Sequence, residues 1–182
     1  MGIALPLCHL SLLLLLSISF NYVGHRNLVS ADEALIQLQC HNAEVPSTCI
    51  QCVKSDPKGE SAGKVGIANI IITTCLSNNA KSLKHNMTVL ASTPPGKGEK
   101  TVLQSCEKAF SDATYDLAKA TAMLGAKDYD KTNGLVAAAL AREVFCKENM
   151  LDNKVTVPDS VVYQMRVYEE LSNAALRIVD RF

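Results

Sequence analysis

Six cysteines follow an apolar leader in this chain, and these two features together restrict its fold more than any other part of the sequence. Residues 3–20 are almost continuously apolar, and the first charged side chain is Arg26. Small residues lead up to Ala31, so we expect a signal peptidase to cleave after Ala31, with an earlier cut near Ser19 as an alternative. A signal anchor is a second alternative, because no basic residue precedes the apolar run. The sequence predicts that residues 1–31 are a signal peptide and that the mature chain is secreted.

The cysteines that remain after cleavage are expected to form disulfides, because a secreted chain meets an oxidising compartment. Cys8 leaves with the leader. The six that remain are Cys40, Cys49, Cys52, Cys75, Cys106 and Cys146. An even number permits full pairing but allows many connectivities, so helix periodicity is needed to narrow the choice.

Composition excludes several classes of function. The 18 basic and 18 acidic side chains are scattered along the chain, which argues against nucleic acid or an anionic membrane as a partner. There is no Trp, and so few aromatic residues that a base-stacking or sugar-stacking surface has little material. Only His41 and His85 remain after cleavage, and neither lies in a metal-binding or catalytic motif. We therefore expect no catalytic residue, no metal and no cofactor.

The clearest helix is predicted over residues 99–124, where apolar side chains recur at spacings of three and four. Its predicted core face consists of Leu103, Cys106, Phe110, Ala113, Leu117, Ala120 and Leu124. An earlier helix is predicted over residues 60–86, with Cys75 on its apolar stripe. A Pro- and Gly-rich turn at residues 92–98 separates the two, so they should pack antiparallel. That packing can bring Cys75 and Cys106 face to face, and we expect a disulfide between them.

Two further helices complete the prediction. One covers residues 131–149 and is preceded by Asp128 as a plausible N-cap, and the other begins at Pro158 and runs to Phe182. Four helices with short connections predict an up-down-up-down four-helix bundle over residues 58–182.

A short helical hairpin is predicted before the bundle, over residues 32–57. It is too small to be stable alone, so a disulfide within it has an obvious structural role. Cys40 and Cys49 flank its turn and are expected to pair. Cys52 then pairs with Cys146, replaces Cys49 as the partner of Cys40, or stays free. The predicted fold class is all-α, with a disulfide-linked hairpin preceding the bundle in one domain.

In this order, the leader, cysteines and helices resemble the plant invertase and pectin methylesterase inhibitor family. The resemblance rests on QCHNAEVPSTCIQCVKSDP at residues 39–57, on Cys75 and Cys106, and on AAALAREVFC at residues 137–146. It implies the same hairpin and bundle, with bonds matching Cys40–Cys49 and Cys75–Cys106. Members of that family are not enzymes, and they cap the active-site cleft of secreted carbohydrate-active enzymes.

One departure from the family bears on the target. Family inhibitors of acid invertase often carry Pro-Lys-Phe between the second and third bundle helices, where this chain has Lys127, Asp128 and Tyr129. These three are the candidate partner-binding residues, although Asp128 as a helix cap and Tyr129 as a packing residue are a simpler interpretation. The same segment resembles pollen-allergen members of the family. We expect a 1:1 complex with pectin methylesterase, slightly favoured over acid invertase, in the apoplast, with the vacuole as the alternative compartment.

A second departure is Cys52, which creates a Cys-x-x-Cys spacing with Cys49. In another setting that spacing indicates an extracellular thiol-disulfide oxidoreductase, which is the alternative function. Such a redox pair requires a strand-helix-strand scaffold, and the sequence predicts none. A zinc site built from the hairpin cysteines and a histidine would have irregular ligand spacing.

One modification site is predicted. The sequence Asn86-Met87-Thr88 is an N-glycosylation sequon close to the end of the first bundle helix. A glycan on Asn86 is therefore expected to be accessible.

Overall fold

The computed structural model describes residues 31–93 and 96–182, and residues 31–182 make up one compact unit. Over the described ranges the chain is helical and contains no strand. The predicted signal peptide lies outside the described residues, apart from Ala31. Within the part of the chain that is described, no helix is both long and apolar enough to cross a membrane.

A helical hairpin opens the described chain. It consists of α2 (Ala31–Cys40) and α3 (Pro46–Ser55), and the short 3-10 turn η1 (Gly59–Ser61) follows it. Pro46 is the first residue of α3, a position where its missing N–H leaves no hydrogen bond unmade. Cys40 and Cys49 are bonded across the hairpin, with Cα atoms 5.6 Å apart. The disulfide-linked hairpin expected from the sequence is therefore present.

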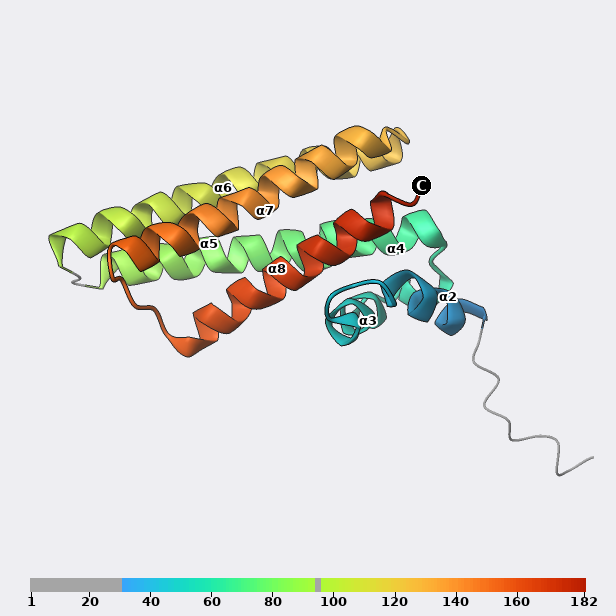
Figure 1. Cartoon of the computed structure of the whole chain (residues 1–182), viewed down its shortest axis with the longest axis horizontal. Coiled ribbons are helices and arrows are strands. Elements are labelled where there is room, and N and C mark those ends of the chain that lie inside the picture. Colours follow the sequence, from blue (N-terminus) through green and yellow to red (C-terminus); the bar gives the residue numbers. More distant parts are fainter. Residues whose placement is uncertain (1–30, 94–95) are drawn as a thin grey trace, which may run out of the picture. The chain divides into compact units, whose positions relative to one another are not determined.

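Four long helical segments form the up-down-up-down bundle. The first is continuous through α4 (Lys64–Ile70), η2 (Ile71–Leu76) and α5 (Ser77–Ser92), and it is followed by α6 (Lys97–Gly125), α7 (Tyr129–Asp152) and α8 (Asp159–Val179). Figure 1 shows α6 and α7 running side by side, with α5 packed against α6 and α8 against α7. The hairpin packs against η2 and α8.

The π-helical segment η2 is the one irregularity in the first bundle helix that the sequence did not predict. The backbone N–H of Ser77 donates to the carbonyl of Ile72, five residues earlier, and the Ser77 hydroxyl donates to the same carbonyl at 2.9 Å. A π turn carries one more residue than an α turn, so it rotates the side chains on either side of it relative to a regular helix. The direction in which Cys75 points could not be predicted from a uniform 3.6-residue period.

The bundle core follows the predicted apolar stripes. All seven residues of the predicted core face on α6 are buried. On α8 the buried stripe includes Met165, Tyr168 and Ile178, and the Tyr168 ring meets Phe110 of α6 edge-on, with centroids 6.1 Å apart. These contacts confirm the helix faces that were predicted from spacing.

The disulfides outside the hairpin differ from the prediction. Cys75 is bonded to Cys52, and Cys106 is bonded to Cys146, so the predicted bond between Cys75 and Cys106 is wrong. Cys106 lies in the seam between α6 and α7, whereas Cys75 in η2 faces α3 of the hairpin. Periodicity identifies the interior face of a helix but does not identify which neighbour a given residue on that face will meet.

This pairing also bears on the alternative redox function. Cys49 and Cys52 belong to two different disulfides, with Cys40 and Cys75 respectively. The dithiol couple that an oxidoreductase would cycle is therefore divided between two structural bonds, and the Cys-x-x-Cys spacing is not a redox motif in this fold.

Candidate functional site

The three predicted partner-binding residues form the turn between α6 and α7. Lys127 adopts a left-handed conformation with φ of 62°. Its N–H donates to the carbonyl of Leu124 at 3.0 Å, and the N–H of Asp128 donates to that of Met123 at 2.9 Å. This pair of bonds is the Schellman motif, in which glycine is the usual residue at the left-handed position. The backbone of the turn is therefore defined by α6 itself, with a lysine where glycine would be least strained.

Asp128 caps α7, as its position in the sequence predicted. Its carboxylate accepts from the N–H of Lys131 at 3.2 Å, and the Lys131 ammonium lies 3.2 Å away. The backbone hydrogen bond from Lys131, followed by the side-chain contact, lowers the pKa of the Asp128 carboxyl below its ordinary value. The Asp128 carboxylate therefore binds a residue of its own chain, at the start of α7.

Tyr129 packs against the end of the chain. Its ring meets that of Phe182 edge-on, with centroids 5.0 Å apart, and the Lys64 ammonium lies 4.7 Å from the Phe182 ring centroid. Tyr129 is half-buried as a result. The packing interpretation of this residue accordingly matches the structure.

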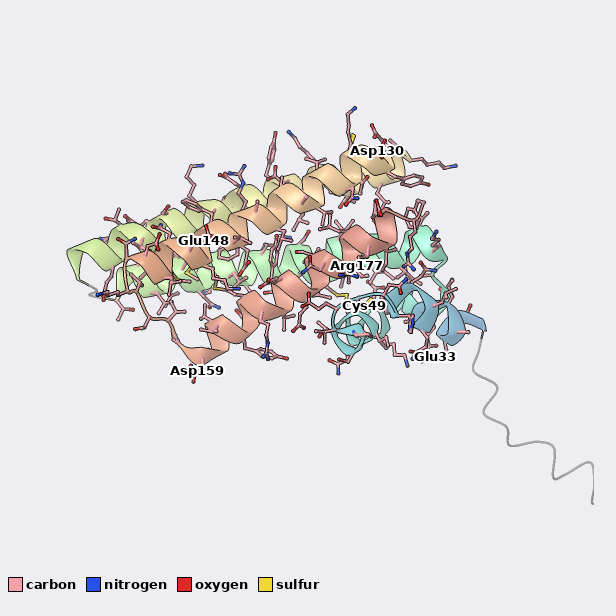
Figure 2. The ribbon with its side chains drawn as sticks, in the orientation of Figure 1. Glu33, Cys49, Asp130, Glu148, Asp159 and Arg177 are labelled. Carbon is pink, nitrogen blue, oxygen red and sulfur yellow. A yellow bond between two sulfur atoms is a disulfide. The ribbon has the colours of Figure 1, made fainter. Side chains whose placement is uncertain are left out.

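A shallow hollow of about 270 Å³ lies beside the turn. It is lined by Lys127, Asp128, Tyr129, Asp130, Asn133, Val179, Asp180 and Phe182. Figure 2 shows Asp130 at the same end of the bundle as Arg177, whereas Glu148 and Asp159 lie toward the opposite end. Three carboxylates and one ammonium give this end a mixed, mainly acidic surface, and the predicted residues meet there.

A larger hollow of about 440 Å³ lies on the side of the bundle, between α6 and α7, and we call it the side groove. It is lined by Ser105, Lys108, Ala109 and Asp112 from α6 and by Ala138, Ala141, Arg142 and Phe145 from α7. Phe145 is 49% exposed, so a large part of its ring is open to solvent at this hollow. Its neighbour Cys146 is buried in the bond to Cys106, so the backbone that presents Phe145 is fixed in the seam.

Charged side chains border the side groove in pairs. The Lys108 ammonium lies 2.9 Å from the Asp112 carboxylate, and this hydrogen bond lowers the pKa of Asp112. Arg142 lies 3.6 Å from Asp116 through its Nε atom. An aromatic ring surrounded by a polar rim is an arrangement found at surfaces that meet another protein.

Sequence reasoning missed the side groove. The available signal was the position of Phe145 beside Cys146, because adjacent residues on a helix point about 100° apart. A buried Cys146 therefore places Phe145 toward the edge of the helix. The sequence did not reveal that three alanines would leave the space beside it open.

The predicted glycosylation site is less open than expected. Asn86 lies within α5 and is half-buried. Its Nδ2 atom, the atom that would carry a glycan, donates to Oε1 of Gln164 on α8 at 2.8 Å. A glycan on Asn86 would have to be accommodated beside this contact between two bundle helices.

Acidic side chains do not gather into a metal-binding set in residues 31–93 and 96–182. No group of three or more His, Cys, Asp or Glu side chains there could hold a metal ion. Glu169 lies 3.0 Å from Lys147, whereas Glu170 accepts a hydrogen bond from Thr48 of the hairpin at 2.6 Å. The two adjacent acids therefore serve separate structural contacts.

Comparison with known proteins gives a consistent result. A family model described as plant invertase/pectin methylesterase inhibitor matches residues 34–178. A pectinesterase inhibitor from Actinidia deliciosa is 27% identical over 139 residues, which cover 75% of this chain and 74% of that protein. The cell wall / vacuolar inhibitor of fructosidase 2 from Arabidopsis thaliana is 25% identical over 173 residues, which cover 92% of this chain and 96% of that protein.

Solved structures share the fold. A crystal structure of a mutant form of a pectin methylesterase inhibitor from Arabidopsis aligns with a TM-score of 0.68 and 20% identity, over 80% of this chain and 95% of that one. A second, of a pectin methylesterase inhibitor from Arabidopsis thaliana, aligns with a TM-score of 0.61 at 20% identity, over 82% and 96%. This chain therefore shares its overall fold with both.

Proposed function

The chain belongs to the plant invertase/pectin methylesterase inhibitor family, and from this membership we propose that it is a secreted inhibitor of pectin methylesterase. Relatives named as inhibitors of pectinesterase and of fructosidase both match it, so family membership alone leaves the target open. In this proposal the chain has no catalytic role. It forms a 1:1 complex and covers the active-site cleft of its partner.

We choose pectin methylesterase as the target because of the residues in the turn between α6 and α7 and the contacts that they make. The family resemblance associates invertase inhibition with Pro-Lys-Phe at this turn, and the chain has Lys127, Asp128 and Tyr129 instead. Tyr129 is packed on Phe182, and Asp128 caps α7. Of the three side chains, only that of Lys127 is exposed, so this turn has little to insert into a sugar-binding site.

The side groove supports an approach by the side of the bundle. It combines an exposed ring at Phe145 with small residues and charged rims, and it lies on two helices that are bonded together through Cys106 and Cys146. A surface that is already rigid loses little conformational entropy when a partner binds, so modest contacts can give useful affinity.

The mechanism that we propose is steric exclusion. No bond is made or broken, because the bundle occupies the space that the polysaccharide would need. Export through the predicted leader would place the chain in the cell wall, with the vacuole as the alternative. Three disulfides in the described chain suit such an oxidising compartment.

The test is a parallel titration of the mature, oxidised protein against pectin methylesterase and acid invertase at mildly acidic pH. Inhibition of pectin methylesterase at a 1:1 ratio, with invertase unaffected at the same concentration, is the expected result. Inhibition of invertase alone would overturn the choice of target. Failure to inhibit either enzyme at micromolar concentration would overturn the proposed function and leave only the shared fold.

A further inference from the structure

A buried glutamate in the bundle is not used by the proposed function. Glu143 on α7 is 0% exposed, and neither of its carboxylate oxygens has a hydrogen-bond partner in the described structure. An ionised carboxylate in that position would lose its hydration without replacement, which is among the costliest arrangements in a protein core.

The groups around Glu143 compensate for its charge only in part. On its own helix, Lys147 is a cation that favours the ionised form of Glu143, but its ammonium is bound to Glu169 of α8 at 3.0 Å. Tyr168 also faces Glu143 from α8, and its hydroxyl donates to the carbonyl of Ala139 at 3.2 Å. From α6, Asp116 brings another carboxylate toward this region. Its Oδ2 atom lacks a hydrogen bond but lies 3.6 Å from Nε of Arg142, so that cation is paired with Asp116.

These surroundings favour the neutral acid. Burial is the main cause that raises the pKa of the Glu143 carboxyl, to about 7, while Lys147 opposes the shift and Glu169 adds to it. Burial also raises the pKa of the Tyr168 hydroxyl, which therefore stays neutral throughout this range. Of Glu143 and Tyr168, Glu143 is thus the group whose charge changes between mildly acidic and mildly alkaline conditions.

The disulfides determine which helices can move apart when Glu143 becomes charged. Cys106 and Cys146 join α6 to α7, so these helices cannot separate at that point. By contrast, α8 contains no cysteine and is held to α7 by packing and by contacts such as Lys147 to Glu169. A charge that appears between the helices will be relieved most easily by movement of α8.

We propose that Glu143 makes the packing of α8 against α7 depend on pH. The two helices pack tightly when this side chain is protonated in a mildly acidic compartment, and their packing loosens when it ionises. The direction follows from linkage. A group that holds its proton more tightly in the folded state contributes stability that is complete under acidic conditions, below the ordinary glutamate pKa. That contribution is lost as the pH rises through about 7. This inference does not depend on which enzyme is the target.

The test is hydrogen exchange of α8 amides in the oxidised mature protein at pH 6 and pH 8, corrected for the intrinsic exchange rate. The equilibrium constant for local opening of α8 in the wild type is expected to rise about tenfold between pH 6 and pH 8. Glu143→Gln, which mimics the protonated acid, is expected to remove the rise. Glu148→Gln is the matched control, because Glu148 is an exposed glutamate on the same helix (Figure 2). It should behave as the wild type does.

Two results would overturn the proposal: a flat pH response in the wild type, or the same rise in Glu143→Gln as in the wild type. Should the variant fail to fold, infrared titration of the wild type supplies an independent readout. A protonated carboxylic acid band that persists to about pH 7 is expected, well above the range of an ordinary glutamate. Ionisation of every carboxyl by pH 6 would contradict the proposal.

Discussion

Cys52 is bonded to Cys75, with Cα atoms 6.0 Å apart, so the hairpin is covalently joined to the first bundle helix. The Thr74 hydroxyl donates to Oδ2 of Asp56 at 2.8 Å close to this bond. The hydrogen bond from Thr48 to Glu170 also ties α3 to α8. Arg181 also donates from Nη2 to the carbonyl of Gln39 in α2 at 2.9 Å. The hairpin, which is expected to bury too little apolar surface to stand alone, is therefore held to the bundle by one covalent bond and by hydrogen bonds.

Removing this bond should destabilise the whole unit. The double variant Cys52→Ala with Cys75→Ala is expected to lose about 3 kcal/mol of unfolding free energy, because the bond closes a loop of 23 residues in the unfolded chain. Urea denaturation of the oxidised proteins measures the loss.

Peptide mapping of the wild type should find the disulfide pairs 40–49, 52–75 and 106–146. A peptide that links Cys75 to Cys106 would contradict the structure.

The disulfides show how far sequence reasoning reaches here. The pair within the hairpin could be predicted because Cys40 and Cys49 lie next to each other across one short turn. Cys106 was placed correctly on an interior face, whereas Cys75 is half-buried in η2 and faces the hairpin. The π turn at η2 and the position of each residue along the bundle decided their partners. Which helix a cysteine faces depends on how the helices are assembled, and it cannot be predicted from the spacing of apolar residues within one helix.

Lys127→Gly tests the role of the turn between α6 and α7. Glycine has no side-chain strain in the left-handed conformation, so unfolding free energy should rise by about 0.5–1 kcal/mol. Lys154→Gly is a matched control, because Lys154 has φ of 53° and the same two backbone bonds at the end of α7. Both variants should inhibit pectin methylesterase as the wild type does. A loss of inhibition in Lys127→Gly alone would place Lys127 at the interface with the partner.

Tyr129 is expected to matter for stability rather than for binding. Tyr129→Ala removes the edge-on contact with Phe182 and should cost about 1–2 kcal/mol, whereas Tyr129→Phe keeps the ring and should cost little. Thermal denaturation measures both. Tyr115→Ala serves as the control, because Tyr115 is 62% exposed on α6. Equal melting temperatures for the two alanine variants would show that the contact with Phe182 contributes nothing.

Phe145 is the residue in the side groove that should contribute most to binding. If the proposed function holds, Phe145→Ala is expected to weaken inhibition of pectin methylesterase at least about tenfold with little change in melting temperature, because a large exposed ring is a frequent hot spot. Leu151→Ala is the control on the same helix, since Leu151 is 77% exposed and does not line the side groove. An equal effect of both variants would argue against the side groove as the interface.

The core position of Glu143 could have been recognised from spacing alone. Val136, Ala139, Cys146 and Met150 are buried, and residue 143 continues their three-and-four spacing along α7. Its acidic side chain would normally be assigned to the solvent face, because glutamate is almost never fully buried without a partner. The conflict between its position and its chemistry is the signal that marks it as unusual.

Steady-state kinetics of pectin methylesterase with increasing amounts of the mature protein provide the most direct measurement of cleft capping. If the bundle and the polysaccharide compete for the same space, the apparent KM should rise with inhibitor concentration while kcat stays constant. A fall in kcat at unchanged KM, or no inhibition at all, would contradict steric exclusion at the active site.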